Sequence, residues 1–382
     1  MPFRFLSYRT AIIVALVAYF CIPYPTGLGT NAVVAAPGFV RTLAILYDYI
    51  GLPEEYRKLR PIYRSRGPVD DNHHEDTAAQ LGTTTSLIAR SQTTVPLTPS
   101  TMAMANTTSS SRTPVYFLSH GGPSIVFDTA HPSYTQLQLI GLEITQKIKP
   151  KAIVVFSAHW QSSPTEIKVN TASTPTLIYD FSGFPQEYYN LQYPHHGSPQ
   201  LAGRILKLLH GAGIQAQGVN RGLDHGVWAP FTCAFHPETN PLTVPIVQVS
   251  LFDSEDPGQH YALGSAMAAL REEGVQVICS GMSVHNLRDY RRAGMSVREG
   301  EAMPYAVSFD EALKDAVERE PGSRRREAMR DLVQRGDARE AHPSLEHLLP
   351  VFVAAGAAGE DAGRRIWTMA ERSLAWGQYR FG

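Results

Sequence analysis

From residue 114 onward, short apolar runs alternate with longer amphipathic stretches along the chain. The runs are rich in β-branched and aromatic residues and end at small ones, which predicts buried strands over 115–118, 153–156, 167–169, 214–218, 246–251 and 275–279. Between them, apolar spacing typical of helices predicts helices over 134–148, 199–210, 259–272, 305–319 and 344–355. The last stretch, 366–381, alternates like an antiparallel strand or hairpin. This order predicts a single α/β domain with a mostly parallel or mixed central sheet flanked by helices.

The first 113 residues differ from the rest. Arg4 and Arg9 precede an apolar run from Ala11 to Ile22, which resembles a signal peptide or membrane anchor but falls short of the roughly 20 apolar residues of a membrane span. Residues 83–113 are dominated by Ser and Thr and have too little apolar surface to offset the entropy of folding. We expect a targeting or anchor segment at 1–36, a largely disordered linker at 37–113 and the folded domain at 114–382. A functional segment 1–36 would tether the protein to a membrane or send it into the secretory pathway; without one we expect a cytoplasmic protein.

Composition excludes several classes of protein. The 382 residues carry a net charge of −1, so no overall field attracts nucleic acid. Three cysteines without a CxxC spacing argue against a disulfide framework and against a cysteine-based zinc site. Of the 14 histidines, all but His73 and His74 follow residue 112, which favours a histidine-based site in the folded domain.

Three of those histidines follow predicted strands. His120 comes after 115–118 and precedes Gly121-Gly122, His159 comes after 153–156, and His285 follows 275–279 across a few small residues. In an open α/β sheet the carboxyl ends of the strands form the binding edge, so three imidazoles could converge there on one metal ion. Imidazole suits iron, zinc and copper, and three protein ligands leave positions open for water and substrate.

Several motifs resemble one family in the same order along the chain. They are Phe117–Pro123 (FLSHGGP), Ser157–Trp160 (SAHW), Tyr179–Pro185 (YDFSGFP), Gly197–Pro199 (GSP), Asp224–Gly226 (DHG), Val284–Arg288 (VHNLR) and Glu346–Pro350 (EHLLP). Together they are similar to the class III extradiol ring-cleavage dioxygenases, in the branch of the DOPA dioxygenases. The resemblance covers about residues 114–382 and makes this part the catalytic domain.

The resemblance implies a function for five histidines. It implies that His120, His159 and His285 bind one divalent metal ion per chain, and that His225 and His347 act as acid/base groups in the active site. The ion is expected to be Zn²⁺ or Fe²⁺, with Fe²⁺ expected for oxygenation because zinc has no redox chemistry. The implied reaction inserts both atoms of O₂ into a catechol and yields a muconic semialdehyde.

Other residues are candidates for binding the substrate. Tyr179, Asp180 and Tyr188 lie in or near the YDFSGFP motif, and Arg288 could hold a carboxylate. The implied partners are a small catechol and O₂, with no nucleic acid. The sequence departs from the family pattern at His195-His196, where apolar or small residues are expected before GSP.

Two rival functions remain open on the sequence alone. The same scaffold also serves non-enzymatic binding proteins, because a fold does not determine a function. A zinc hydrolase could use the same ligands with a metal-bound hydroxide, although no HExxH motif is present. The sequence leaves the native metal, the particular catechol and the oligomeric state open.

Overall fold

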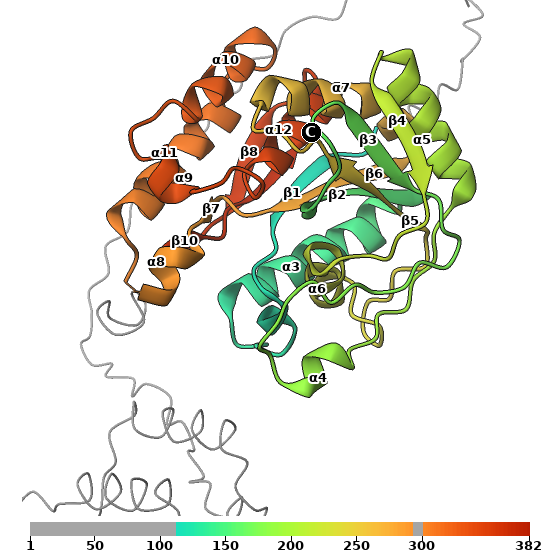
Figure 1. Ribbon diagram of the computed structural model, residues 1–382, viewed down its shortest axis with the longest axis horizontal. Coiled ribbons are helices and arrows are strands. Elements are labelled where there is room, and N and C mark those ends of the chain that lie inside the picture. Colours follow the sequence, from blue (N-terminus) through green and yellow to red (C-terminus); the bar gives the residue numbers. More distant parts are fainter. Residues whose placement is uncertain (1–111, 293–300) are drawn as a thin grey trace, which may run out of the picture. The chain divides into compact units, whose positions relative to one another are not determined.

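The computed structural model describes residues 112–292 and 301–382, which form an eight-stranded mixed sheet with helices on both faces (Figure 1). The strand order is β4-β3-β5-β2-β6-β1-β11-β8. Its four central strands run parallel: β5 (Ile246–Leu251), β2 (Ala152–Gln161), β6 (Val275–Gly281) and β1 (Val115–Ser119). Beyond β5 lie β3 (Glu166–Asn170), antiparallel to it, and β4 (Gln215–Val219). The α/β fold with a mixed sheet is therefore confirmed.

The central strands are apolar at consecutive positions because both faces of the sheet are covered. In β1, Val115 and Phe117 belong to one buried apolar cluster, whereas Tyr116 and Leu118 belong to another. Side chains alternate between the two faces of a strand, and a parallel sheet between two helical layers buries both sets. This is why the strands read as continuous apolar runs in the sequence.

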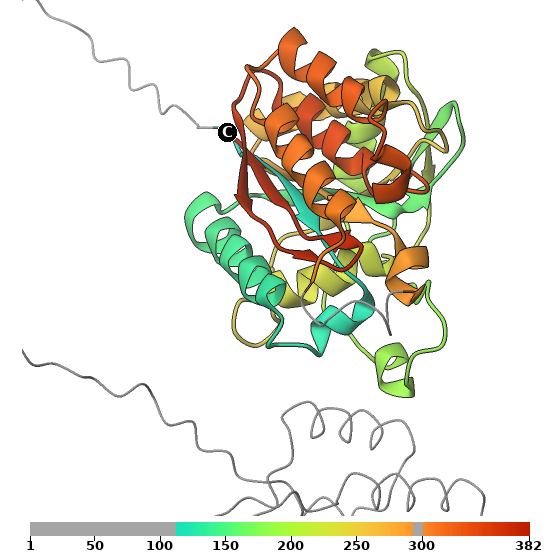
Figure 2. The ribbon, with the colours of Figure 1, turned by 90° about the vertical axis from the view of Figure 1, so that its left-hand side faces the viewer.

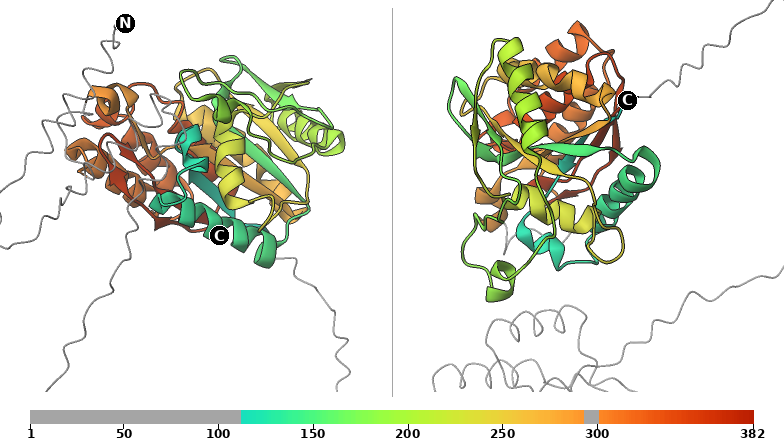
Figure 3. Two further views of the ribbon diagram at one scale, coloured as in Figure 1. Left: turned by 90° about the horizontal axis from the view of Figure 1, so that it is seen from below. Right: turned by 90° about the vertical axis from the view of Figure 1, so that its right-hand side faces the viewer.

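Each face of the sheet has its own helices. The cluster that contains Val115 also holds residues of α5 (Pro199–Gly211), α7 (Pro257–Glu272), α9 (Pro304–Val317) and α12 (Leu349–Ala358). The opposite cluster holds residues of α3 (Pro132–Leu142) and α6 (His225–Ala234). Figure 1 shows α3 and α6 next to each other below the sheet, and in the left view of Figure 3, seen from below, they lie in front of it. The sheet is thus the middle of three layers.

The end of the chain completes the sheet next to its first strand. Strand β11 (Gln378–Phe381) is antiparallel to β1 and to β8 (Gly363–Trp367), and Figure 2 shows these red strands beside β1. A small second sheet joins β7 (Val284–His285), β10 (Leu374–Ala375) and β9 (Ala370–Glu371). The remaining short elements are η2 (Pro123–Val126), η3 (Glu143–Ile148), α4 (Gln186–Tyr189), α8 (Leu287–Arg292), α10 (Ser323–Leu332) and α11 (Ala338–Ala341).

The predicted elements compare with the structure as follows. All six predicted strands are present, with β5 at the predicted bounds and β2 longer by five residues at its carboxyl end. The helix predicted over 134–148 is α3 followed by a π-helical turn, η3. The helix predicted over 344–355 begins only at Leu349, so that start was wrong, and α6 and α10 were not predicted.

Some expectations concern parts of the chain that the structure does not describe. The targeting segment 1–36 and all but the last two residues of the linker 37–113 lie outside the described residues. Within 112–292 and 301–382, no helix combines the length and apolar character needed to cross a membrane.

Candidate active site

The three predicted metal ligands lie at or shortly beyond the carboxyl ends of the parallel strands β1, β2 and β6. His120 directly follows β1, and its backbone N–H donates to the carbonyl of Gly281, the last residue of β6, at 2.9 Å. His159 lies near the carboxyl end of β2, where the pairing with β5 becomes irregular. His285 ends the two-residue strand β7, shortly after β6. The carboxyl ends of β1, β6 and β2 therefore meet at one edge, as predicted.

Two further histidines enter from helix starts. His225 is the first residue of α6, and His347 lies in the turn immediately before α12. Two glycines permit the close approach: a Cβ on Gly226 would lie 2.8 Å from His159 Cδ2, and a Cβ on Gly281 would overlap the His347 carbonyl oxygen. Small residues are thus required where these backbones meet the imidazoles.

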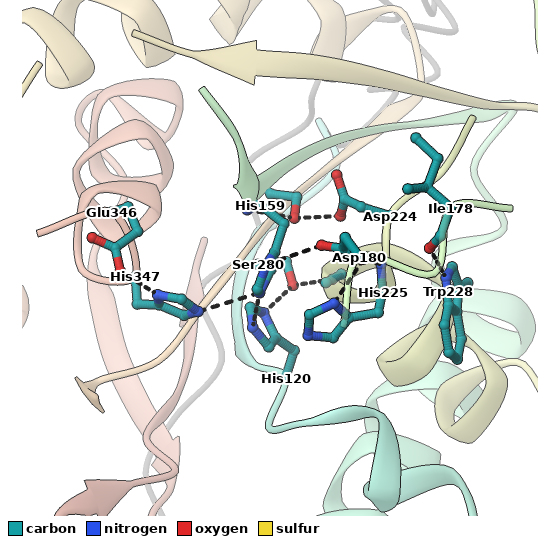
Figure 4. Close-up of polar contacts among 12 residues, drawn as sticks. His120, His159, Ile178, Asp180, Asp224, His225, Trp228, Ser280, Glu346 and His347 are labelled. Carbon is teal, nitrogen blue, oxygen red and sulfur yellow. Dashed lines mark hydrogen bonds and ion pairs between the residues drawn. The ribbon is translucent and has the colours of Figure 1, made fainter. Parts of the chain in front are cut away.

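The five predicted histidines form one connected cluster, and Figure 4 labels all of them except His285. His159 Nε2 lies 3.2 Å from His120 Nε2 and 3.2 Å from His347 Nε2. The His225 ring is centred 3.9 Å from that of His159. His285 stacks on His347 with 3.6 Å between ring centroids. The structure therefore brings all five together, with His285 adjoining the other four through His347.

Polar contacts at the far side of four of these rings determine which nitrogen faces the centre. The Ser280 hydroxyl donates its single hydrogen to the Gly226 carbonyl, so toward His120 Nδ1, 2.9 Å away, it can only accept. His120 therefore carries its hydrogen on Nδ1 and presents a lone pair at Nε2.

Carboxylates fix three more rings in the same way. Asp180 lies 2.8 Å from His225 Nδ1 and 3.2 Å from His159 Nδ1, and Glu346 lies 3.0 Å from His347 Nδ1. An ionised carboxylate only accepts, so each of these Nδ1 atoms donates. His120, His159, His225 and His347 therefore each direct an Nε2 lone pair into the site. The Nε2 atoms of His120 and His347 each lie 3.2 Å from that of His159.

The environment keeps the rings of His120, His347 and His285 neutral. Burial lowers the pKa of His120 and His347 well below the ordinary value, and the neighbouring histidines lower both further. Burial also lowers the pKa of His285 to about 3. Burial raises the pKa of Asp180, but its hydrogen bonds to His159 and His225 outweigh this, so its pKa is lowered and the carboxylate stays ionised.

This arrangement fits a metal ion. Two imidazole lone pairs at 3.2 Å repel each other unless a cation lies between them. Nitrogen ligands about 2.0–2.1 Å from a tetrahedral ion are separated by roughly 3.3 Å, close to the observed spacing. Metal-capable groups in the described part of the chain are His120, His159 and His225, and His285, Glu346 and His347. The donor set is thus suited to one divalent ion.

The predicted substrate-binding residues are more dispersed. Tyr179 donates from its hydroxyl to the Leu191 carbonyl at 2.6 Å, and Tyr188, on α4, packs against Phe127 with ring centroids 4.4 Å apart. Arg288 is exposed on α8. Asp180 lies within the histidine cluster, and both its oxygens face imidazoles.

Sequence reasoning missed three side chains that contact the histidines. Ser280 follows the predicted strand 275–279, and Glu346 adjoins His347 within the EHLLP motif, yet neither was assigned a role. Phe181 presents its ring edge-on to His225 at 5.7 Å, with 90° between the planes. The position of Ser280 directly after a strand that leads to a histidine was the available signal.

Comparisons with known proteins identify the family of this chain. Residues 114–376 match the family described as the catalytic LigB subunit of aromatic ring-opening dioxygenase. A 4,5-DOPA dioxygenase extradiol of Beta vulgaris is 36% identical over 272 residues, which is 70% of this chain and 95% of that protein. The Escherichia coli protein of the same name is 35% identical over 65% of this chain and 86% of its own length.

A solved structure shares the fold. The crystal structure of an uncharacterized protein from Escherichia coli K12 aligns with a TM-score of 0.56 and 28% identity, covering 71% of this chain and 100% of the other. The family match spans well over half of the chain, and the relatives align over most of their length. The chain therefore belongs to the LigB family of class III extradiol, ring-opening dioxygenases, in its DOPA-dioxygenase branch, and is a metal-dependent oxidoreductase.

Proposed function

We propose that this dioxygenase opens the ring of a DOPA-like catechol and that Fe²⁺ is its working metal. The names of its relatives in Beta vulgaris and Escherichia coli support the substrate class. The observation that carries the proposal is the convergence of three Nε2 lone pairs. His159 Nε2 lies 3.2 Å from His120 Nε2 and 3.2 Å from His347 Nε2. Bound iron(II) would supply the redox chemistry for O₂ that zinc lacks.

In this proposal His120 and His159 hold the ion, and the stacked pair of His285 and His347 completes the set. One imidazole of the pair is the third ligand, and the other first accepts a proton from the second catechol hydroxyl and then returns it as an acid during ring opening. The resemblance favours His285 as the ligand. His347 has the shorter link to His159, at 3.2 Å between Nε2 atoms, and its Nδ1 is anchored on Glu346.

His225 is the proposed general base. Its Nδ1 donates to Asp180, so its Nε2 lone pair can accept a proton from a catechol hydroxyl. Burial lowers the pKa of His225, partly offset by the hydrogen bond to Asp180, so the ring is neutral and able to accept near pH 7. Phe181, edge-on to this ring, is placed to exclude water from its apolar side.

A metal-loading experiment tests the proposal. The full-length protein is purified without oxygen, loaded with Fe²⁺ or with Zn²⁺, and mixed with DOPA or unsubstituted catechol in air. We expect a yellow ring-opened product from DOPA with iron and none with zinc. His120→Ala should lose both metal and product, whereas His225→Ala should keep the metal and lose about 10²–10⁴ in kcat.

The same assay separates the rival functions. Stoichiometric metal binding without product from any catechol would contradict the proposal and favour a binding protein or hydrolase. Comparing His285→Ala with His347→Ala shows which of the two histidines is the ligand and which is the acid. The variant that loses the ion identifies the ligand. The variant that keeps the ion but has a lowered kcat identifies the acid.

A further inference from the structure

The carboxylate of Asp180 joins two histidines that have different roles. Its Oδ1 accepts from His225 Nδ1 at 2.8 Å and from the His225 backbone N–H at 3.0 Å, and its Oδ2 lies 3.2 Å from His159 Nδ1 (Figure 4). Both oxygens are therefore directed at imidazoles, one of a proposed metal ligand and one of the proposed base. The sequence predicted a substrate contact for Asp180, and the structure shows that its carboxylate also has two imidazole partners.

The segment that carries Asp180 is firmly attached to α6. The Ile178 backbone N–H donates to the Leu223 carbonyl at 2.7 Å, and Trp228 Nε1, on α6, donates to the Ile178 carbonyl at 2.9 Å. Tyr179, the next residue, is tied to Leu191 through its hydroxyl. These bonds anchor the two residues that precede Asp180, whose side chain is 23% exposed.

We propose that Asp180 is a positioning residue that sets the tautomers of His159 and His225 together. The inference rests on the proposed function, in which His159 binds the metal and His225 accepts the proton. A neutral imidazole carries one hydrogen, and the carboxylate holds it on Nδ1 in both rings, so both Nε2 lone pairs face the centre. Residues that orient metal-binding histidines in this way commonly change metal affinity or activity by about 10- to 100-fold when replaced.

One carboxylate therefore links two measurable properties. Without it, each ring can place its hydrogen on Nε2 or turn about its side chain. A hydrogen on His159 Nε2 blocks metal binding, and a hydrogen on His225 Nε2 removes the acceptor for the catechol proton. Loss of Asp180 should thus weaken metal binding through His159 and slow turnover through His225.

The first test compares two variants with the same change in charge. Asp180→Asn keeps the shape but places an amide, which donates, opposite one imidazole. Glu187→Gln removes an exposed carboxylate from α4, seven residues along the chain. We expect Asp180→Asn to weaken Zn²⁺ binding, measured with a competing chelator, by about 10- to 100-fold and to lower kcat with little change in KM. Glu187→Gln should stay within about twofold of the wild type in all three quantities.

A double variant separates the two routes. In a His225→Ala background, Asp180→Asn should lower kcat no further, because its effect on turnover acts through the missing imidazole. The same double variant should still lose Zn²⁺ affinity relative to His225→Ala, because that effect acts through His159. A full further loss in kcat would contradict the route through His225.

Direct observation of the tautomers needs no variant. Long-range ¹H–¹⁵N spectra of the zinc-loaded wild type should show the hydrogen of His159 and His225 on Nδ1. Hydrogen on Nε2 in either ring would overturn the proposal, as would an Asp180→Asn protein with wild-type Zn²⁺ affinity and kcat. A raised KM with unchanged kcat would make Asp180 a substrate contact instead. If no catechol is opened, the proposed function fails, while Zn²⁺ affinity and the tautomer spectra still decide the role of Asp180.

Discussion

The Ser280 hydroxyl is the acceptor that holds the hydrogen of His120 on Nδ1. Replacing it with alanine frees the ring to place that hydrogen on Nε2, so Ser280→Ala should bind Zn²⁺ about 10- to 100-fold more weakly. The matched control is Ser133→Ala, which removes a buried hydroxyl in α3 far along the chain from these histidines. Competition with a chelator measures the Zn²⁺ affinity of both variants. Equal affinities in the two variants would contradict this role of Ser280.

Buried histidines also make the metal-free protein sensitive to acid. Burial lowers the pKa of His285 to about 3 and of His342 to about 4, from an ordinary value of 6.5. Between those values and 6.5 the unfolded chain binds protons that the folded chain does not, so stability falls as the pH falls. At pH 5 each histidine should lower the free energy of unfolding by about 2 kcal/mol relative to pH 7.5.

Urea unfolding in the presence of a chelator at pH 7.5 and pH 5 checks this expectation. His342→Gln can still donate to the Ser283 carbonyl, which His342 Nε2 contacts at 2.9 Å, but it cannot titrate. In this variant the free energy of unfolding should therefore fall by about 2 kcal/mol less between pH 7.5 and pH 5 than in the wild type. Equal stability of the wild type at the two pH values would contradict the assignment of these rings as neutral.

Some residues of the site can be predicted from the sequence and others cannot. Strand-end positions led to His120 and His159 because apolar runs and small residues mark the carboxyl edge of a sheet. The partnership of Asp180 with His225 has no such signal, because the two are 45 residues apart and meet only through the path of the loop. The histidines were therefore predictable, whereas what orients them was not.

At the scale of elements, helix α6 positions the proposed base through a close contact with β2. A Cβ on Gly226 would overlap Ser157 Oγ and lie 2.8 Å from His159 Cδ2. Gly226→Ala should therefore lower the free energy of unfolding by about 1–3 kcal/mol and also weaken Zn²⁺ binding by displacing His159. Gly203→Ala, in α5, meets nothing within 4 Å and should instead stabilise the protein by about 0.4–1 kcal/mol. Thermal and urea unfolding distinguish the two, and a tolerated Gly226→Ala would show that the helix can shift.

Strands and helices were predicted correctly where their burial produces a regular pattern of apolar residues, and a helix was missed where complete burial leaves no such pattern. The strands were found because runs of β-branched residues end at small ones. Helix α6 was missed because all ten of its residues are buried and Pro230 lies in its interior, so it has no amphipathic stripe and carries a residue that argues against a helix. The start of α12 was placed too early because the turn around His347 continues the apolar spacing.

At the scale of the whole molecule, the described residues form a continuous core of their own. Its two apolar clusters run from Val115 to Phe381 and cover both faces of the sheet. A chain of residues 100–382 should therefore fold, bind one metal ion and open DOPA with a kcat within about twofold of the full-length protein. Circular dichroism, metal analysis and the product assay test this. A truncated chain that aggregates would show that the preceding residues take part in folding.

The pairing of β1 with β11 has a consequence for how the protein is made. Synthesis proceeds from the amino end, so β1 is produced long before its neighbours β6 and β11, which occupy its two edges. Until then an apolar strand with two open edges is exposed to other chains. His347 also emerges near the end, so the five-histidine cluster is complete only late in synthesis. We therefore expect the finished chain to hold the ion more tightly than a nascent one, and a chaperone that shields β1 to raise the yield of active enzyme.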